Sequence, residues 1–324
     1  MTRLFALVVA AAILVAVEAR AAEDAGSYPN RPIRWIVPFP PGGAADLVSR
    51  ALSQKIAERL GQQIVIDNRA GAAGNIGTEL AARAAPDGYT VVIVPATFTT
   101  NPALSSKLAY DPQKSFAPIS LVSSSALVLV VHPSLPATSI KALVALAKAR
   151  PGQLNYASSG VGASAHLAAE LFRSATDTEL THVPYKGQPP AMIDMLSGQV
   201  QVMFANIPVS LPHIRSGRLR GLGVTTLSRT SLFPELPTIA ESGIPGFEVN
   251  QWSGLLAPAG TAPPLVQKLY DAVSAALKEP DVRAGLTAQG FDPVGSTPAD
   301  FARYIAAEIA KWNAVIRKAG IRAD

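Results

Sequence analysis

Short apolar runs alternate with glycine-rich turns and helix-forming segments along most of this chain. In the first third, the pattern predicts strands over 33–39, 64–66 and 90–94, with a helix over 45–60. The helix is indicated by apolar residues at three- and four-residue spacing, and Gly61 can end it. Alternation of strand and helix is typical of a parallel sheet covered by helices. The chain therefore has the local pattern of an α/β protein.

A second series of the same kind begins near Leu127. It predicts strands at 127–131, 154–157, 180–183, 200–204 and 219–224, with helices at 139–149, 163–174 and 190–196. Three helical segments follow at 264–278, 281–289 and 298–318, and we expect them to return to the first series, which otherwise has too few covering helices. The 324 residues suffice for two domains. We predict a first domain of 27–126 plus 251–324 and a second of 127–250, joined by a hinge with two crossings.

The segment 1–21 is predicted to be a secretory signal peptide. Arg3 precedes an unbroken apolar run over 4–17, and Ala19-Arg20-Ala21 supplies the small residues of a cleavage site. The run is shorter than the roughly 20 apolar residues that a bilayer-spanning helix needs. The sequence also contains no cysteine, which suits a bacterial periplasm, where a large core makes disulfides dispensable. We therefore expect a periplasmic protein.

Several classes of function are disfavoured by composition and motifs. The net charge of +5 is mild, and no run of Lys and Arg is interleaved with aromatics, so nucleic acid is not an expected partner. Without cysteine there is no thiol nucleophile, and the four histidines lack metal-binding spacing. The chain contains neither a GxSxG nucleophile elbow nor a GxxxxGK[ST] phosphate loop. We expect no catalytic residues, no cofactor and no metal, and the protein is predicted not to be an enzyme.

Four loops that follow predicted strands carry glycine or small polar residues: 39–46, 68–77, 95–101 and 158–164. Open α/β sheets bind ligands beyond the carboxyl ends of their strands. A helix start there presents unpaired N–H groups, and glycine leaves them accessible. Any single loop can need its glycines for turn geometry alone. The loops at 39–46 and 158–162 fall in different predicted lobes, so two helix starts facing across a cleft could each hold a carboxylate.

The candidate ligand-binding residues come from these loops and a few further positions. His166 could donate to an anion or orient the loop before it. Tyr185 could reach the cleft, whereas the neighbouring Lys186 can equally be solvated. Asp46 can complement its helix dipole, order the glycine loop or meet a ligand amine. The predicted set is Phe39, Pro41, Gly42, Gly43, Ala44, Asp46, Thr97, Ser158, Ser159, Gly160, Gly162, His166, Tyr185 and Asn206.

Several short motifs occur in a characteristic order: Val37-Pro38-Phe39 with Gly42-Gly43, Asn68-Arg69 through Gly77, Pro86-Asp87-Gly88-Tyr89-Thr90, Tyr156 through Gly162 with His166, Pro184-Tyr185-Lys186-Gly187, and Gly243-Ile244-Pro245-Gly246-Phe247. Together they resemble the substrate-binding receptors of tripartite tricarboxylate transporters, the Bug (Bordetella uptake gene) or TctC-like family. The resemblance spans essentially the whole mature chain.

The resemblance implies a periplasmic-binding-protein type II, or Venus flytrap, fold whose two α/β domains close around a cleft. It implies a small carboxylate held by backbone amides and bridging waters from 39–46 and 158–162. It also implies two membrane partners, a large transmembrane subunit and a small four-helix subunit, and we expect the receptor itself to be a monomer. Relatives often carry Asp where this chain has Gln201, and Ala205-Asn206 also lacks an acid. This departure favours di- or tricarboxylates or aromatic acids over amino acids.

Two other functions remain open at this stage. A periplasmic sensor for a membrane kinase would use the same ligand-driven closure, because a ligand that contacts both lobes favours the closed state by its differential affinity. A secreted α/β hydrolase would need an assembled acid–base set that the sequence does not show. A pull-down of the membrane partner would identify the first, and turnover of a bound ester the second.

Overall fold

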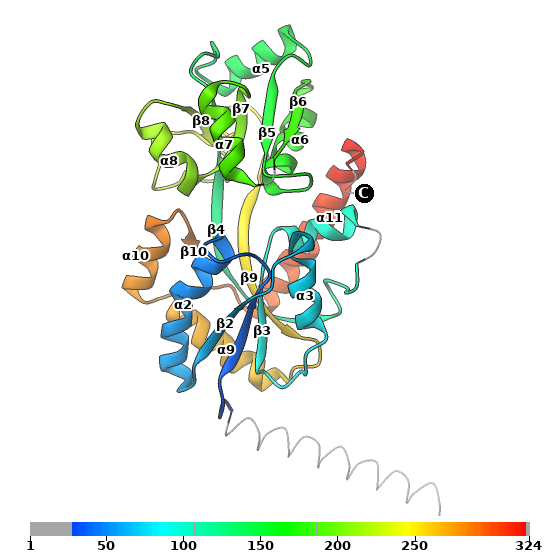
Figure 1. Ribbon diagram of the computed structural model, residues 1–324, viewed down its shortest axis with the longest axis vertical. Helices are drawn as coiled ribbons and strands as arrows, with labels where there is room; N and C mark the ends of the chain where they lie inside the picture. The colour runs from blue at the N-terminus through cyan, green and yellow to red at the C-terminus, as the bar shows by residue number, and fades with distance from the viewer. Residues whose placement is uncertain (1–27, 106–107, 186, 322–324) are drawn as a thin grey trace, which may run out of the picture.

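The computed structural model describes residues 28–105, 108–185 and 187–321, so the predicted signal peptide and Lys186 lie outside it. One long strand, β4 (Phe116–Val131), joins two groups of strands into a single ten-stranded sheet. The strand order is β2-β1-β3-β9-β4-β7-β5-β6, and β8 and the short β10 (Asp292–Pro293) also pair with β4. In Figure 1 the helices and strands gather at two ends of the molecule, with β4 and β9 (Asn250–Pro258) running between them.

Lobe 1 is the group of elements around β1, β2, β3 and β9. The parallel strands β1 (Ile33–Val37), β2 (Ile64–Asn68) and β3 (Thr90–Pro95) pair side by side, and β9 is antiparallel to β3. Alternate residues of each strand point to opposite faces. Val91 and Ile93 pack with α2 (Ala44–Leu60) and α9 (Pro263–Ala276), whereas Val92 and Val94 pack on the other face. The remaining lobe 1 helices are α3 (Asn75–Ala82), α4 (Thr97–Leu104) and α10 (Pro280–Ala288).

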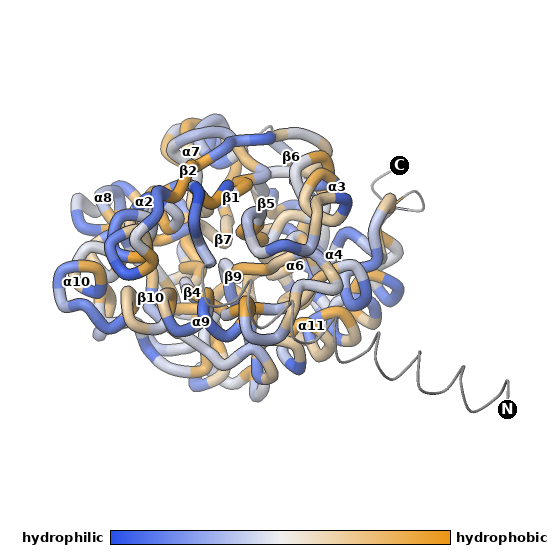
Figure 2. Tube along the Cα trace, turned by 90° about the horizontal axis from the view of Figure 1, so that it is seen from below, coloured by the Kyte–Doolittle hydropathy of each residue, from blue (hydrophilic) through white to orange (hydrophobic). Residues whose placement is uncertain are grey.

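Lobe 2 is the group around β5 (Asn155–Ser158), β6 (Thr181–Pro184), β7 (Val202–Asn206) and β8 (Arg220–Val224). Leu127, Leu129 and Val131 of β4 pack on one face, where α5 (Ile140–Ala149) and α6 (Ser164–Thr176) lie. Val128 and Val130 pack on the other face, beneath α7 (Gln188–Ser197) and α8 (Ile207–Arg215). Figure 2 shows the hydrophobic strands β4, β7 and β9 inside and hydrophilic segments along the outer helices.

The last helix, α11 (Pro298–Ala319), contacts both lobes. Phe301 and Ile305 near its start pack in lobe 1, and Trp312 and Ile316 near its end pack in lobe 2. A helix of 22 residues is about 33 Å long, which is enough to reach from one lobe to the other. The sequence placed all three late helices on the first lobe; α9 and α10 lie there, but α11 joins the two.

Several elements differ from the sequence-based expectation, among them β4, α4 and α8. β4 starts at Phe116, well before the predicted start at 127. The sequence did not predict this first half because it contains Pro118 and several serines, which do not form an apolar run. The helices α4 and α8 were not predicted, and each contains an internal proline, Pro102 or Pro212. Among the described helices, none combines the length and the apolar character that a membrane-spanning segment requires.

Candidate ligand-binding site

The carboxyl edges of the two parallel strand groups face each other along β4. β3 ends at Pro95, which pairs with Ser253, and Ser253 pairs with Ser123 of β4. β7 runs the opposite way and ends at Asn206, which pairs with Leu127 of β4. Ser123 and Leu127 are four residues apart along β4, which corresponds to about 13 Å. Since ligands bind α/β sheets at the carboxyl ends of their strands, both lobes present their binding edge to the same space.

The loop between β1 and α2 is held by Asp46, whose side chain is 2% exposed. The Gly42 N–H donates to Asp46 Oδ2 (2.9 Å), as does Arg50 Nε (2.8 Å), and Asn68 Nδ2 donates to Oδ1 (3.0 Å). The same Asn68 amide group donates to the Phe39 carbonyl. Asp46 therefore orders the glycine loop, which is one of the three roles left open from the sequence.

The carboxyl group of Asp46 stays ionised to low pH. Burial alone would raise its pKa, but hydrogen bonds from Arg50, Gly42 and Asn68 outweigh that effect and lower the pKa to about 2. Hydrogen bonds from N–H donors stabilise the charged form of a carboxyl group. Hydrogen-bond donors of the same lobe therefore stabilise the negative charge of Asp46.

The 68–77 loop shows glycines with a packing role. A Cβ on Gly77 would lie 2.7 Å from the Arg69 carbonyl oxygen and 2.9 Å from Pro38 Cα, and one on Gly74 would lie 3.0 Å from the Phe39 ring. These two glycines let α3 approach the loop after β1 closely. Directly before Gly74, Ala73 adopts a left-handed conformation (φ 53°), and its carbonyl accepts a hydrogen bond from Asn101 Nδ2 (3.4 Å).

In lobe 2, the loop after β5 is held by its own side chains. The Gly160 N–H donates to Ser158 Oγ (3.2 Å), and the Gly162 N–H donates to His166 Nδ1 (3.0 Å). The other lobe shows the same pattern, because the Gly43 N–H donates to the Pro40 carbonyl (3.4 Å). The glycine amides that the sequence assigned to an anion are therefore engaged within the protein in this conformation.

The N–H groups left for a ligand belong to the first turns of α2 and α6. The N-cap residues are Gly43 and Ala163, and among the described residues no side chain caps either helix start. First-turn N–H groups have no partner within a helix, and the positive end of the helix dipole favours an anion there. The backbone N–H groups without an intrahelical partner therefore belong to the residues that directly follow the predicted glycines.

His182 is a candidate site residue that the sequence did not reveal. Its ring stacks on His166 with centroids 4.0 Å apart, and its Nε2 lies 2.7 Å from Ser158 Oγ. The Tyr156 ring also lies against it, nearly parallel, with centroids 4.7 Å apart. The contact arises because β5 and β6 pair with Tyr156 opposite His182, and this register cannot be read from spacing along the chain.

The other predicted residues lie in the same loops but differ in their contacts. The Tyr185 hydroxyl donates to Asp194 Oδ2 (2.6 Å), and burial together with Asp194 raises the pKa of Tyr185 to about 12. Thr97 begins α4 and is half-buried, as is Ser159. Of the predicted residues in the lobe 1 loop, Pro41, Gly42 and Ala44 are exposed.

Two side-chain oxygens near the lobe 2 edge are buried without a hydrogen-bond partner among the described residues. They are Asn206 Oδ1, at the end of β7, and Gln188 Oε1, at the start of α7. A buried acceptor of this kind is costly to leave unpaired, so a donor from a ligand or a water would stabilise it. Gln201, by contrast, lies at the amino end of β7 and bonds the Asn155 N–H (3.1 Å) and the Gly198 carbonyl (2.9 Å). Gln201 thus has local structural contacts at this end of the strand, and the expectation of an amine-free ligand rests on Ala205-Asn206 at the other end.

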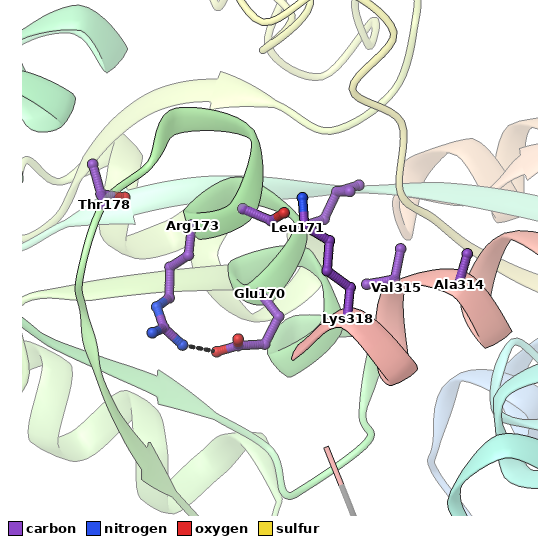
Figure 3. A pocket seen from close by; sticks show the side chains of 8 residues that line it. Glu170, Leu171, Arg173, Thr178, Ala314, Val315 and Lys318 are labelled. Carbon is purple, nitrogen blue, oxygen red and sulfur yellow. Dashed lines mark hydrogen bonds and ion pairs between the residues drawn. The ribbon is translucent and has the colours of Figure 1, made fainter. Parts of the chain in front are cut away.

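A groove of about 490 Å³ lies away from these loops, between α6 and the end of α11. Figure 3 shows its lining, in which Arg173 is paired with Glu170 (2.6 Å) and Lys318 extends from α11. It does not include the strand edges, so we do not assign it as the main site. Within the described chain, no group of three or more His, Asp or Glu side chains is arranged to hold a metal ion.

Comparison with known proteins gives consistent matches over nearly the whole chain. Residues 48–321 match the family described as tripartite tricarboxylate transporter family receptor. Protein BugT of Bordetella pertussis is 40% identical over 325 residues, which cover 99% of each chain. Two structures from Rhodopseudomonas palustris are also similar. Rpa4515 with adipate is 38% identical, with a TM-score of 0.81 over 91% of this chain and 99% of that one. MatC with bound malate is 34% identical, with a TM-score of 0.76 over 89% and 100%.

Proposed function

The chain belongs to the receptor family of tripartite tricarboxylate transporters, and from that premise we propose that it captures a small organic carboxylate between its two lobes. The family consists of solute-binding receptors, and the fold is that of periplasmic binding proteins. The observation that carries the proposal is the pair of uncapped helix starts, α2 and α6, on strand edges that face each other across β4.

The ligand class follows from two helix starts, one in each lobe. Each can hold one carboxylate through first-turn N–H groups, which favours a dicarboxylate. Two relatives of known structure are described with adipate and with malate, both of which carry two carboxylates. The unpaired oxygens of Asn206 and Gln188 would accept hydrogen bonds from a hydroxyl group or a water at the lobe 2 end. We propose an amine-free dicarboxylate as the preferred ligand.

We propose the domain division expected from the sequence, 27–126 plus 251–324 and 127–250, and the strand pairing supports a boundary at 126–127. Ala126 of β4 pairs with Asn250 of β9, and the next residue, Leu127, pairs with Asn206 of β7. The change of partner at 126–127 supports a hinge at this point of β4 and at the start of β9. Ligand contacts to both lobes would then favour the closed form.

The cellular setting is part of the same proposal. We propose that 1–21 is removed during export, that the mature receptor is a periplasmic monomer, and that it catalyses no reaction. It would deliver its ligand to a large transmembrane subunit and a small four-helix subunit. Capture of those subunits by the ligand-loaded receptor in a membrane extract would support this assignment, and capture of a histidine kinase instead would contradict it.

Ligand binding is tested with the purified mature protein. We would measure its melting temperature, and then calorimetric affinity, with adipate, malate, citrate, benzoate, aspartate and glutamate. A ligand that binds only the native state raises the melting temperature. We expect the largest increase with a dicarboxylate that lacks an amine. Tighter binding of aspartate or glutamate than of every amine-free acid would contradict the ligand class, and the absence of any increase would contradict the site.

A further inference from the structure

Two histidine rings lie beneath the loop over 158–162, which is the lobe 2 ligand loop, and their role deepens the proposed function on which this inference rests. His166 is 5% exposed, and its ring lies parallel to that of His182, with an interplanar angle of 6°. Each ring reaches one end of the loop. His166 contacts the Gly162 N–H directly, and His182 contacts Gly160 through Ser158.

The bond to Gly162 fixes the protonation state of His166. An imidazole nitrogen can accept an N–H donor only through a free lone pair, so Nδ1 carries no proton and the single proton of the neutral ring is on Nε2. A protonated ring would place an N–H group against the Gly162 N–H. The hydrogen bond that holds the loop therefore exists only in the neutral state of His166.

Ser158 connects the second ring to the loop. Its Oγ accepts the Gly160 N–H and lies 3.1 Å from the Gly160 carbonyl and 2.7 Å from His182 Nε2. The hydroxyl carries one proton, which goes either to that carbonyl or to His182. In both arrangements, His182 fixes the orientation of the hydroxyl that holds Gly160.

We propose that His182 and His166 are positioning residues for the ligand loop, and that His166 must be neutral for the loop to present the start of α6 to a carboxylate, so that mild acid weakens ligand binding. The stacked rings act as one unit because a positive charge on either would face the other at 4.0 Å. The proposal concerns the loop geometry and requires no direct contact between a histidine and the ligand.

The surroundings of the pair keep it neutral. Burial is the main cause that lowers the pKa of His166 to about 4, with His182 and Arg173 adding to the shift and Glu170 opposing it. Burial also lowers the pKa of His182, again with Glu170 opposing and Arg173 adding. Glu170 is itself engaged, because it accepts the Tyr156 hydroxyl and the Arg173 guanidinium, both at 2.6 Å. These charged groups line the groove of Figure 3, where Lys318 adds a further positive charge.

The direction of the pH effect follows from linkage. The pKa of His166 is about 6.5 when the ring is free and about 4 when it holds the loop. The released state therefore binds more protons between these values. The stabilisation of the loop by the neutral His166 ring is complete above pH 6.5 and is lost as the pH falls through 4. At pH 5.0, the two pKa values allow the ligand affinity to fall by at most about 30-fold.

The sequence left open a different role, in which His166 donates directly to the bound anion. That role predicts the opposite sign, since a protonated imidazole would attract a carboxylate and binding would strengthen in acid. The two roles are therefore separated by the direction of the pH dependence.

The first test needs no ligand. The chain has only four histidines, so their ring nitrogens can be followed individually by NMR between pH 8 and 4. We expect His166 to be an Nε2–H tautomer that titrates below pH 5, with the amide resonances of Gly160 and Gly162 moving at the same midpoint. A midpoint for His166 near 6.5, or glycine amides that do not follow it, would overturn the proposal even if adipate and malate bind normally.

The second test uses calorimetry with adipate and malate at pH 7.5 and 5.0. His166→Asn keeps an acceptor near the Nδ1 position and cannot titrate, and His132→Gln, which changes an outlying histidine of lobe 2, is the control. The ligands change their own protonation equally for every variant, so only differences between variants count. We expect a severalfold acid weakening in the wild type and in His132→Gln that is greatly reduced in His166→Asn. Equal weakening in all three, or stronger binding in acid, would contradict the proposal.

The role of His182 is tested separately from its packing. His182→Phe keeps the stacked ring and removes Nε2, whereas His182→Gln restores an amide group near the Nε2 position. At pH 7.5 we expect the Gly160 amide resonance to shift and binding to weaken severalfold in His182→Phe, with both effects reversed in His182→Gln. Equal behaviour of the two variants would show that His182 only packs. If neither acid binds the wild type, the Gly160 resonance still decides this point.

Discussion

Leu104 of lobe 1 lies directly against Gly162 of lobe 2, so that a Cβ built on Gly162 would be 2.3 Å from Leu104 Cδ1. Leu104 is the last residue of α4, and its side chain packs in the lobe 2 core. A second contact joins the lobes elsewhere, where a Cβ on Gly290 would be 3.1 Å from Ile207 Cγ2. In the described structure, the lobes therefore already touch next to the ligand loop.

The contact with Leu104 predicts the effect of Gly162→Ala. The new methyl group would collide with Leu104, and Gly162 also has a positive φ of 75°. Gly152→Ala is a matched control, because Gly152 has φ 71° and nothing within 4 Å of its Cβ. We expect backbone strain of about 1–2 kcal/mol in both variants, with a further loss of about 1–3 kcal/mol only in Gly162→Ala. Urea unfolding measures this difference, and equal losses would contradict it.

Asp46 predicts a defined acid sensitivity. Its pKa is lowered from 3.8 to about 2, so its contribution to stability is complete above about pH 3.8 and is lost as the pH falls through 2. Asp46→Asn removes the charge and leaves Gly42 and Arg50 with a weaker acceptor, which should cost about 1–3 kcal/mol at pH 7. The difference from wild type should shrink between pH 4 and 2. Denaturant titrations over this range test it, with the exposed Asp271→Asn as a control expected to change little.

Two helix glycines should respond to alanine with opposite signs. In α3, a Cβ at Gly77 would approach the Arg69 carbonyl to 2.7 Å, whereas in α10 a Cβ at Gly285 would meet nothing within 4 Å. Gly285→Ala should stabilise the protein by about 0.5–1 kcal/mol through helix propensity. Gly77→Ala should destabilise it by about 1–3 kcal/mol through overpacking. Melting temperatures of the two variants decide this, and stabilisation by Gly77→Ala would refute the packing role.

The end of α11 should detach when its anchor is removed. Trp312 is 2% exposed and its Nε1 donates to the buried Glu308 Oε2 (2.8 Å). Trp312→Ala should cost about 3–5 kcal/mol and increase hydrogen exchange in the last turns of α11 and in α6. Trp312→Phe keeps most of the packing and loses the hydrogen bond, so it should cost about 1–3 kcal/mol, with a smaller change in exchange. Unchanged exchange in α6 for Trp312→Ala would show that α11 does not support lobe 2.

The general fold could be predicted because its signals are local. Alternating strands and helices, and glycine turns such as the one that ends α2 at Gly61, depend on neighbouring residues and lie where the sequence placed them. The family assignment likewise rested on short motifs and is confirmed by the match over 48–321. The loops proposed as the binding site lie at the carboxyl ends of strands, while their contacts with a ligand stay a prediction.

The remaining features depend on pairing between distant segments. The serine-rich half of β4 is a strand because β9 and β10 pair with it, although its residues alone do not favour one. His182 reaches the ligand loop only through the register of β6 on β5. The glycine amides are engaged by Ser158 and His166, whose rotamers depend on the packing around them. Such relationships are set by tertiary structure, so a single sequence does not contain a readable signal for them.

The attachment of α11 to both lobes restricts how the receptor can open. Two neighbouring strands alone would let the lobes bend and twist in several directions. With Trp312 and Ile316 seated in one lobe and Phe301 and Ile305 in the other, a motion that separated the lobes on the α11 side would expose two large side chains, at about 1.5–3 kcal/mol each. The lobes should instead rotate about an axis close to α11, and the ligand should enter from the side opposite that helix.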